Sequence, residues 1–188
     1  MATIRDRGNS VLIIVDMQVA VMKEAWDSQR IIANVANAVS EARSGGVPVI
    51  WIQHGDDQLP PGSPGWKWAG DLSPIPSETI VSKQFASSFE QTELEQSLEQ
   101  AKASHIILAG AATNFCVRAP AYGALDRGYD LTLLSDAHTT GTMELNGTTI
   151  DAAVIINDLN AVMSWIKNPD RVNKAVPTCD VDFVNLGR

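Results

Sequence analysis

Asp16, His54, Lys83 and Cys116 are the residues of this sequence whose types and positions suggest chemistry. Each stands at or just beyond the end of a short apolar run. A cysteine served by a carboxylate base and an ordering cation can act as a nucleophile. Taken singly, the same side chains have more ordinary explanations: a loop carboxylate, a solvated lysine and a small buried cysteine. Their shared placement is what indicates a single site.

The segment around Cys116 predicts a buried strand, a turn of small residues and then a helix. The apolar run from His105 to Ala109 is typical of a strand buried on both faces. Thr113 or Asn114 is expected to cap the helix that follows. Cys116 would then lie in the first turn of that helix, where N–H groups and the helix dipole favour a thiolate. We therefore expect its pKa to be lowered.

Other apolar runs predict further strands, and helical periodicity lies between them. The strands are expected at Ser10–Val15, Val47–Gln53, Thr79–Ser82, Tyr129–Ser135 and Ala161–Met163, with helices at Ser28–Ser44, after Thr92 and around Thr149–Asn157. Strands that alternate with helices predict a three-layer α/β/α fold with a doubly wound, mostly parallel, Rossmann-like sheet. Ligands bind such sheets beyond the carboxyl ends of the strands, where the four candidate residues stand.

Composition limits the classes of protein to which the chain can belong. Its 188 residues are 45% hydrophobic and 19% charged, as expected for one globular domain over 1–188, with a core at about 10–166 and a tail at 167–188. The net charge of -8 and the lack of a basic run argue against a nucleic-acid partner. No signal core or membrane-length apolar run is seen, so we expect a cytoplasmic protein with no membrane partner.

The stretch 54–71 is long and rich in glycine and proline, as binding loops and lids often are. His54, Asp56 and Asp57 could be metal ligands, but one histidine beside two acids lacks the paired-imidazole spacing of strong metal motifs. No metal site is therefore predicted. The loop instead indicates a polar pocket wall with an apolar lid, although its tryptophans could equally cover an edge of the core. On position alone, the pocket wall is assigned to His54, Trp66, Trp68 and Phe115.

Three ordered motifs carry a resemblance to a known family. They are V-L-I-I-V-D-M-Q at 11–18, V-S-K-Q-F-A-S-S-F at 81–89 and L-A-G-A-A-T-N-F-C-V at 108–117. In order and spacing, from Ser10 to about Trp165, the chain resembles the isochorismatase-like cysteine hydrolases, which include nicotinamidases, N-carbamoylsarcosine amidohydrolase and streptothricin hydrolase. The resemblance implies the isochorismatase-like fold and a homo-oligomer, dimer or tetramer.

The resemblance also assigns roles to individual residues. It implies a catalytic triad of Asp16, Lys83 and Cys116. It further implies a cis peptide bond between Ala112 and Thr113, and an oxyanion hole formed by the backbone N–H groups of Thr113 and Cys116.

Departures from the family pattern narrow the activity that it implies. The strand ending W-I-Q-H has no histidine in the loop after it, unlike the metal motif of nicotinamidases. The loop and the D-A-H-T-T segment at 136–140 look most like the streptothricin hydrolase branch. The resemblance thus implies hydrolysis of a small-molecule amide or related C–N bond through a thioester, with no metal or cofactor. Two alternatives stay open: vinyl-ether hydrolysis of the isochorismatase type, and a non-catalytic thiol redox or ligand-binding module on the same fold.

Overall fold

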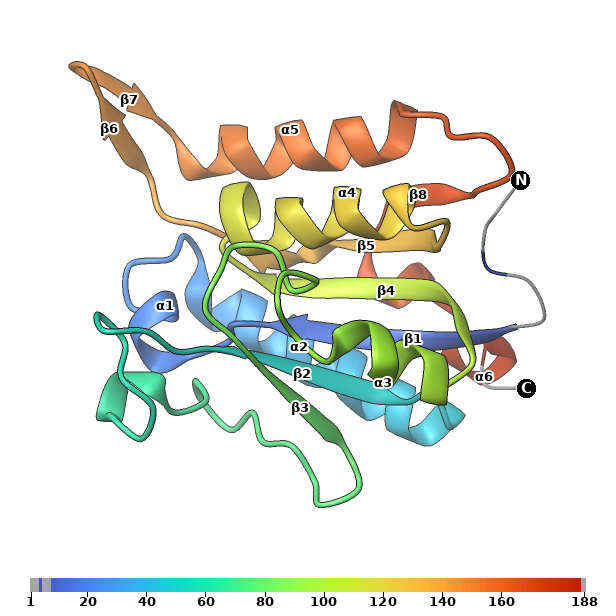
Figure 1. Cartoon of the computed structure of the whole chain (residues 1–188). Coiled ribbons are helices and arrows are strands. Elements are labelled where there is room, and N and C mark those ends of the chain that lie inside the picture. The colour runs from blue at the N-terminus through green and yellow to red at the C-terminus, as the bar shows by residue number, and fades with distance from the viewer. Residues whose placement is uncertain (1–3, 5–7, 187–188) are drawn as a thin grey trace.

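A parallel sheet of six strands forms the centre of the molecule (Figure 1). The computed structural model describes residue 4 and residues 8–186. The strands lie in the order β3-β2-β1-β4-β5-β8. Their bounds are β1 Asn9–Val15, β2 Val49–His54, β3 Thr79–Lys83, β4 Ala103–Ala111, β5 Asp130–Thr139 and β8 Asn173–Val176. All neighbouring strands run parallel, which confirms the predicted fold class.

Helices cover both faces of the sheet. One face is covered by α2 (Ser28–Gly45) and α6 (Phe183–Leu186), and the other by α3 (Leu94–Gln100), α4 (Arg118–Asp126) and α5 (Ala152–Trp165). Short helical segments lie at α1 (Val19–Met22), η1 (Pro64–Trp66), η2 (Thr113–Val117) and η3 (Thr178–Asp180). Among the described residues, no helix has both the length and the apolar character needed to cross a bilayer.

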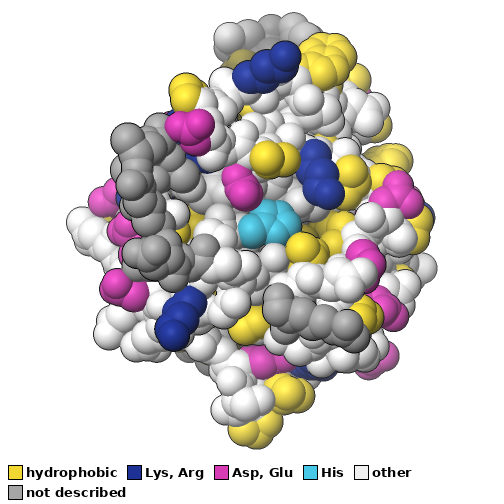
Figure 2. All heavy atoms as spheres, turned by 90° about the vertical axis from the view of Figure 1, so that its right-hand side faces the viewer, with side chains coloured by type: hydrophobic (Ala, Val, Ile, Leu, Met, Phe, Trp, Pro, Cys, Tyr) yellow, Lys and Arg dark blue, Asp and Glu magenta, His cyan; other side chains and the backbone are white. Residues whose placement is uncertain are grey.

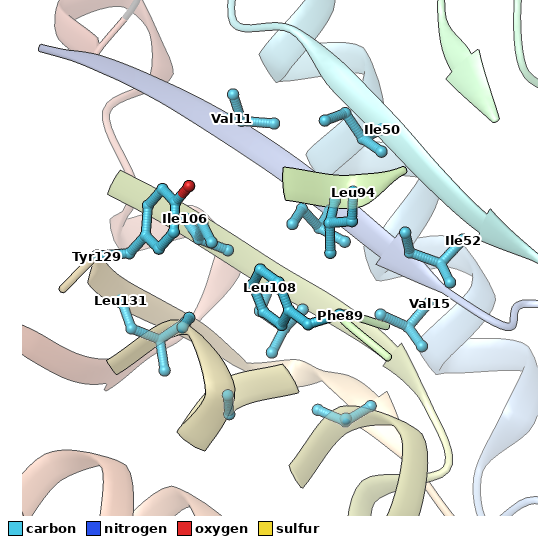
Figure 3. Packing of buried hydrophobic residues seen from close by; sticks show 14 of the residues in the cluster. Val11, Val15, Ile50, Ile52, Phe89, Leu94, Ile106, Leu108, Tyr129 and Leu131 are labelled. Atoms are coloured by element: carbon cyan, nitrogen blue, oxygen red, sulfur yellow. The ribbon is translucent and has the colours of Figure 1, made fainter. Parts of the chain in front are cut away.

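The central strand β1 is buried on both faces, which explains its unbroken apolar sequence. Val11, Ile13 and Val15 point to the α3–α4–α5 side, and Leu12 and Ile14 point to the α2 side. Figure 3 shows the core on the α3–α4–α5 side of the sheet. There, side chains from β1, β2, β4 and β5 contact side chains that precede α3 or lie on it. Each fully buried side chain of this size stabilises the fold by about 1.5–3 kcal/mol. This packing holds the strand ends in fixed positions.

Two parts of the later chain differ from the sequence prediction. Residues 161–163 do not form a strand but continue α5, because Ile155, Leu159 and Met163 repeat at helical spacing along its buried face. The sixth strand is instead β8, in the segment predicted as a tail. A hairpin of β6 (Met143–Leu145) and β7 (Thr148–Ile150) was also not predicted, although the Asn-Gly pair between its strands is a typical hairpin turn.

The strands begin at the end of the molecule on the right of Figure 1, near the start of β1 and the end of α6. Figure 2 looks onto this end and shows acidic and basic side chains interspersed around a histidine. The carboxyl ends of the strands lie at the opposite end, so the candidate site is on the side away from this view.

Candidate active site

Four neighbouring strands bring the candidate residues to one edge of the sheet. Asp16 follows β1, His54 ends β2, Lys83 ends β3 beside His54, and Cys116 follows β4. β1 and β4 are adjacent, and the strand order reverses between them. Such a reversal is the usual binding position of doubly wound sheets.

The Lys83 ammonium joins the acid to the thiol. Its Nζ lies 2.6 Å from Asp16 Oδ2 and donates to Cys116 Sγ at 3.2 Å and to the Phe85 carbonyl oxygen at 3.1 Å. An ammonium has three N–H donors, so these three acceptors satisfy it completely. The side chains of Lys83 and Asp16 are 0% and 1% exposed. Lys83 therefore holds the other two groups in fixed positions, shielded from water.

Asp16 is a buried carboxyl with one oxygen still available. Burial raises its pKa, and the charge and hydrogen bond of Lys83 act in the opposite direction. Among the described residues, its Oδ1 has no partner of regular hydrogen-bond geometry. The backbone is left-handed at this residue, with φ 47°, so the chain turns sharply where β1 ends. A raised pKa and a free oxygen suit a group that accepts a proton during a reaction.

The expectation of a lowered Cys116 pKa is wrong. Burial and the adjacent Asp16 carboxylate raise the pKa of the thiol to about 11, although Lys83 opposes them. The helix dipole favours the thiolate, but the carboxylate next to the sulfur belongs to Asp16, which follows β1. At neutral pH the side chain is therefore a thiol whose proton can pass to Asp16.

The start of the helix at Cys116 also differs from the prediction. Cys116 lies in the π-helical turn η2, which α4 continues, and no side chain caps this turn. Thr113 Oγ1 instead bonds His138 Nδ1 at 2.9 Å, and His138 Nε2 bonds Asn160 Oδ1 at 2.9 Å. His138 is fully buried, which lowers its pKa to about 4 and keeps the ring neutral. This buried chain of hydrogen bonds fixes the first residue of the turn.

The cis peptide bond lies one position earlier than predicted. It joins Ala111 to Ala112, whereas the resemblance placed it between Ala112 and Thr113. The Ala112 carbonyl oxygen already accepts hydrogen bonds from the N–H groups of Phe115 and Val117, at 3.1 Å each. The bond after Ala112 thus belongs to the helical turn, and the change of direction falls at the bond before it.

A cavity of about 530 Å³ opens beside the thiol. It is lined by Asp16, Val21, His54, Asp56, Gln58, Ala86, Ala112, Phe115 and Cys116. Of the predicted pocket wall, His54 and Phe115 line this cavity. Trp66 lines a neighbouring cavity of about 400 Å³ that also borders Lys83. Trp68 packs edge-on against the buried Trp51, so it covers the core instead.

Gln18 is a contributor to the site that the prediction did not use, although it ends the motif at 11–18. Its Nε2 donates to the carbonyl oxygens of His54 and Trp66, at 3.0 Å each, and its Oε1 accepts from the His54 N–H at 2.9 Å. This fully buried amide ties the loop after β2 to the loop after β1. Gln18 thereby sets the position of His54.

His54 and Asp56 form a second polar pair at the cavity. His54 Nε2 lies 2.9 Å from Asp56 Oδ2, and this bond is the largest cause of the lowered pKa of Asp56. Among the described residues, no group of three or more His, Cys, Asp and Glu side chains is placed to hold a metal ion.

The fold and site together define an α/β protein with a cysteine, an acid and a lysine at the carboxyl edge of its sheet. The isochorismatase domain model matches residues 10–166. The chain belongs to the isochorismatase family and is a hydrolase, as its motifs predict.

The relatives of this chain include proteins named as an amidohydrolase and as a hydrolase. The chain is 28% identical to the ureidoacrylate amidohydrolase RutB of Variovorax paradoxus, over 86% of this chain and 79% of that one. It is 31% identical to streptothricin hydrolase of Streptomyces noursei, over 69% of this chain and 54% of that one. In structure it resembles a cysteine hydrolase of Pseudomonas syringae pv. phaseolicola 1448A, with a TM-score of 0.87, 21% identity and coverage of 96% and 94%.

Proposed function

We propose that this hydrolase opens a C–N bond of a small amide or ureide through a thioester on Cys116. The observation that carries the proposal is the contact of one buried lysine with both Asp16 and Cys116, beside a cavity that both residues line. Relatives named as an amidohydrolase and as streptothricin hydrolase support amide chemistry. A thiol sensor would need neither the buried acid nor the lysine that orders it.

In the acylation step, the thiol attacks the substrate carbonyl as Asp16 takes its proton. Because burial and Asp16 raise the pKa of the thiol, a base is needed to take its proton, and Asp16 is in contact with it. Lys83 holds the acid and the sulfur together through its three hydrogen bonds. It stabilises the sulfur as negative charge develops there.

The oxyanion is assigned to the backbone N–H groups of Thr113 and Cys116. The N–H groups of Phe115 and Val117 are bound to the Ala112 carbonyl oxygen, so they serve the turn itself. Each oxyanion donor contributes about 3 kcal/mol to such a reaction. When the tetrahedral intermediate collapses, Asp16 returns the proton to the departing amine. Water then hydrolyses the thioester.

The charge of the cavity favours neutral or cationic substrates. Its described lining includes the carboxyl groups of Asp56 and of Asp16, which is paired with the buried Lys83, but no lysine or arginine. A substrate carboxylate close to Asp56 would be repelled by its charge. Isochorismate is a dicarboxylate, so this lining favours amide hydrolysis over vinyl-ether hydrolysis.

Intact-protein mass spectrometry with a panel of small amides, ureides, lactams and nicotinamide tests this function. The wild type should release an amine or ammonia and carry a transient acyl adduct. Cys116→Ala should lose both while keeping the native circular dichroism. Cys179→Ala is the matched control, because Cys179 is the exposed free cysteine outside the site. Turnover by Cys116→Ala at the wild-type rate would overturn the thioester mechanism.

A further inference from the structure

We propose that His54 is a second catalytic base of this site, acting through Nδ1 on the water that hydrolyses the thioester. The inference rests on the proposed function and divides its two half-reactions between two residues. Asp16 serves acylation and His54 serves deacylation.

Asp56 sets the tautomer of the His54 ring. Asp56 Oδ2 can only accept from His54 Nε2, because the carboxyl is ionised, with a lowered pKa. In the neutral ring, Nε2 therefore carries the hydrogen and Nδ1 the lone pair. Asp56 is itself held in place, because its Oδ1 accepts from the N–H groups of Gln58 at 2.8 Å and Leu59 at 2.7 Å. A base oriented by a fixed carboxylate is a recurring catalytic arrangement.

The free nitrogen is buried and belongs to a cavity-lining side chain. His54 Nδ1 has no hydrogen-bond partner among the described residues. Leaving a buried polar atom without a partner is unfavourable for folding. His54 lines the same cavity as Asp16 and Cys116. Its position in the wall of that cavity suits the nitrogen to act on a water bound there.

The His54 side chain as a whole is also more exposed than that of Asp16, although Nδ1 itself is buried. The side chain of His54 is 20% exposed, whereas Asp16 is 1% exposed, with Oδ2 bound to Lys83. The amine leaves into the open cavity, and water must approach the thioester from that side. Gln18 holds the backbone of His54 on both its N–H and its carbonyl oxygen, which keeps the ring at this opening.

Deacylation consumes one water molecule and breaks the C–S bond of the thioester. The water oxygen bonds to the thioester carbonyl carbon as His54 Nδ1 takes one water proton. The tetrahedral intermediate then expels the Cys116 sulfur, and the C–S bond breaks. The proton held by His54 returns to the sulfur, directly or through Asp16, and the carboxylic acid product leaves.

Acylation by p-nitrophenyl acetate separates the two half-reactions. Release of p-nitrophenolate reports acylation, and intact and peptide mass spectrometry report the acetyl group on Cys116. His54→Gln should acylate at close to the wild-type rate but lose its acetyl group at least about 100-fold more slowly. Asp56→Asn should slow the same step less, because it disturbs only the orientation of the ring. Added imidazole should restore deacetylation of His54→Ala.

His105→Gln is the matched control. His105 is a histidine at the amino end of β4, with both ring nitrogens bonded, to Ser10 and to Thr132. This variant should deacetylate at the wild-type rate. Equal deacetylation rates in wild type and His54→Gln would overturn the role of His54, as would a parallel loss of both half-reactions without imidazole rescue. A wild type that shows no acetylation dependent on Cys116 would instead overturn the proposed function.

Discussion

At the scale of single residues, the site keeps its nucleophile as a thiol until substrate arrives. Lys83 favours the thiolate, but burial and Asp16 oppose it more strongly and hold the pKa at about 11. A sulfur protonated at rest is also less exposed to oxidation, since the thiolate is the reactive form. Activation therefore depends on the short transfer of a proton to Asp16.

The alkylation rate of Cys116 by iodoacetamide should rise with pH well beyond neutrality. Because the thiolate is the reacting species, the rate should increase about tenfold per pH unit until the pH approaches the pKa. The raised pKa places the end of this rise near 11. Peptide mass spectrometry can follow Cys116 and the exposed Cys179 in one sample. A plateau of the Cys116 rate near neutral pH would contradict this account.

At the scale of elements, the site depends on a close approach of β1 and β4. Gly110 has φ 129°, and a Cβ at this position would lie 2.1 Å from the Val15 carbonyl oxygen. Both strands lead into the site from this contact. Val15 directly precedes Asp16, and β4 leads to Cys116. A glycine is therefore required where the two strands hold the acid and the nucleophile together.

Gly110→Ala should destabilise the protein by at least about 3 kcal/mol, because backbone must move and the left-handed φ adds strain. The free energy of unfolding in urea measures this loss. Gly147→Ala is the matched control: it also has a positive φ, 76°, but open space around the added Cβ. It should cost only about 1–2 kcal/mol. Equal losses in the two variants would show that the strand contact is not what requires glycine.

At the scale of the whole molecule, the segment after α5 completes the fold. β8 pairs with β5 at Leu131–Leu134, and Phe183 of α6 packs into the core under α2. Gly45 of α2 lies so close to α6 that a Cβ there would be 2.5 Å from the Phe183 carbonyl oxygen. The domain model ends at residue 166, before these elements. The C-terminal segment is thus a structural part of this chain.

Phe183→Ala should lower the free energy of unfolding by about 3–5 kcal/mol, since it empties a buried aromatic position. Thermal and urea denaturation measure this change. Below the unfolding transition, the variant should keep the wild-type rate of acetylation on Cys116, because α6 lies at the end of the molecule away from the site. A folded variant with a changed rate would show that the C-terminal segment reaches the site.

The charge of the whole protein should also affect which substrates it hydrolyses. With a net charge of -8 and two carboxyl groups in the cavity, the protein should turn over a neutral amide at least about tenfold more efficiently than its carboxylate analogue. The comparison is of kcat/KM for a matched pair at low and high salt. Added salt should narrow the difference by screening the repulsion. A preference for the carboxylate would indicate a cationic group in the path of the substrate.

Assembly into a dimer or tetramer stays a prediction.

Local patterns in the chain were enough to predict a parallel sheet and to identify the family. Buried strands need continuous apolar runs, and Asp16 stands directly after such a run. Lys83 ends β3, and Cys116 lies in the helical turn that follows β4. The hairpin at 143–150 could also have been predicted from the sequence, since its Asn-Gly turn is a local signal. The remaining features depend on contacts between distant segments. The high pKa of Cys116 arises from burial and from an acid that follows another strand. Trp68 faces the core because Trp51 lies there, and β8 is a strand because it pairs with the edge of β5. The free nitrogen of His54 has the same origin, since Gln18 holds the backbone of His54 and Asp56 holds its ring, from two different loops.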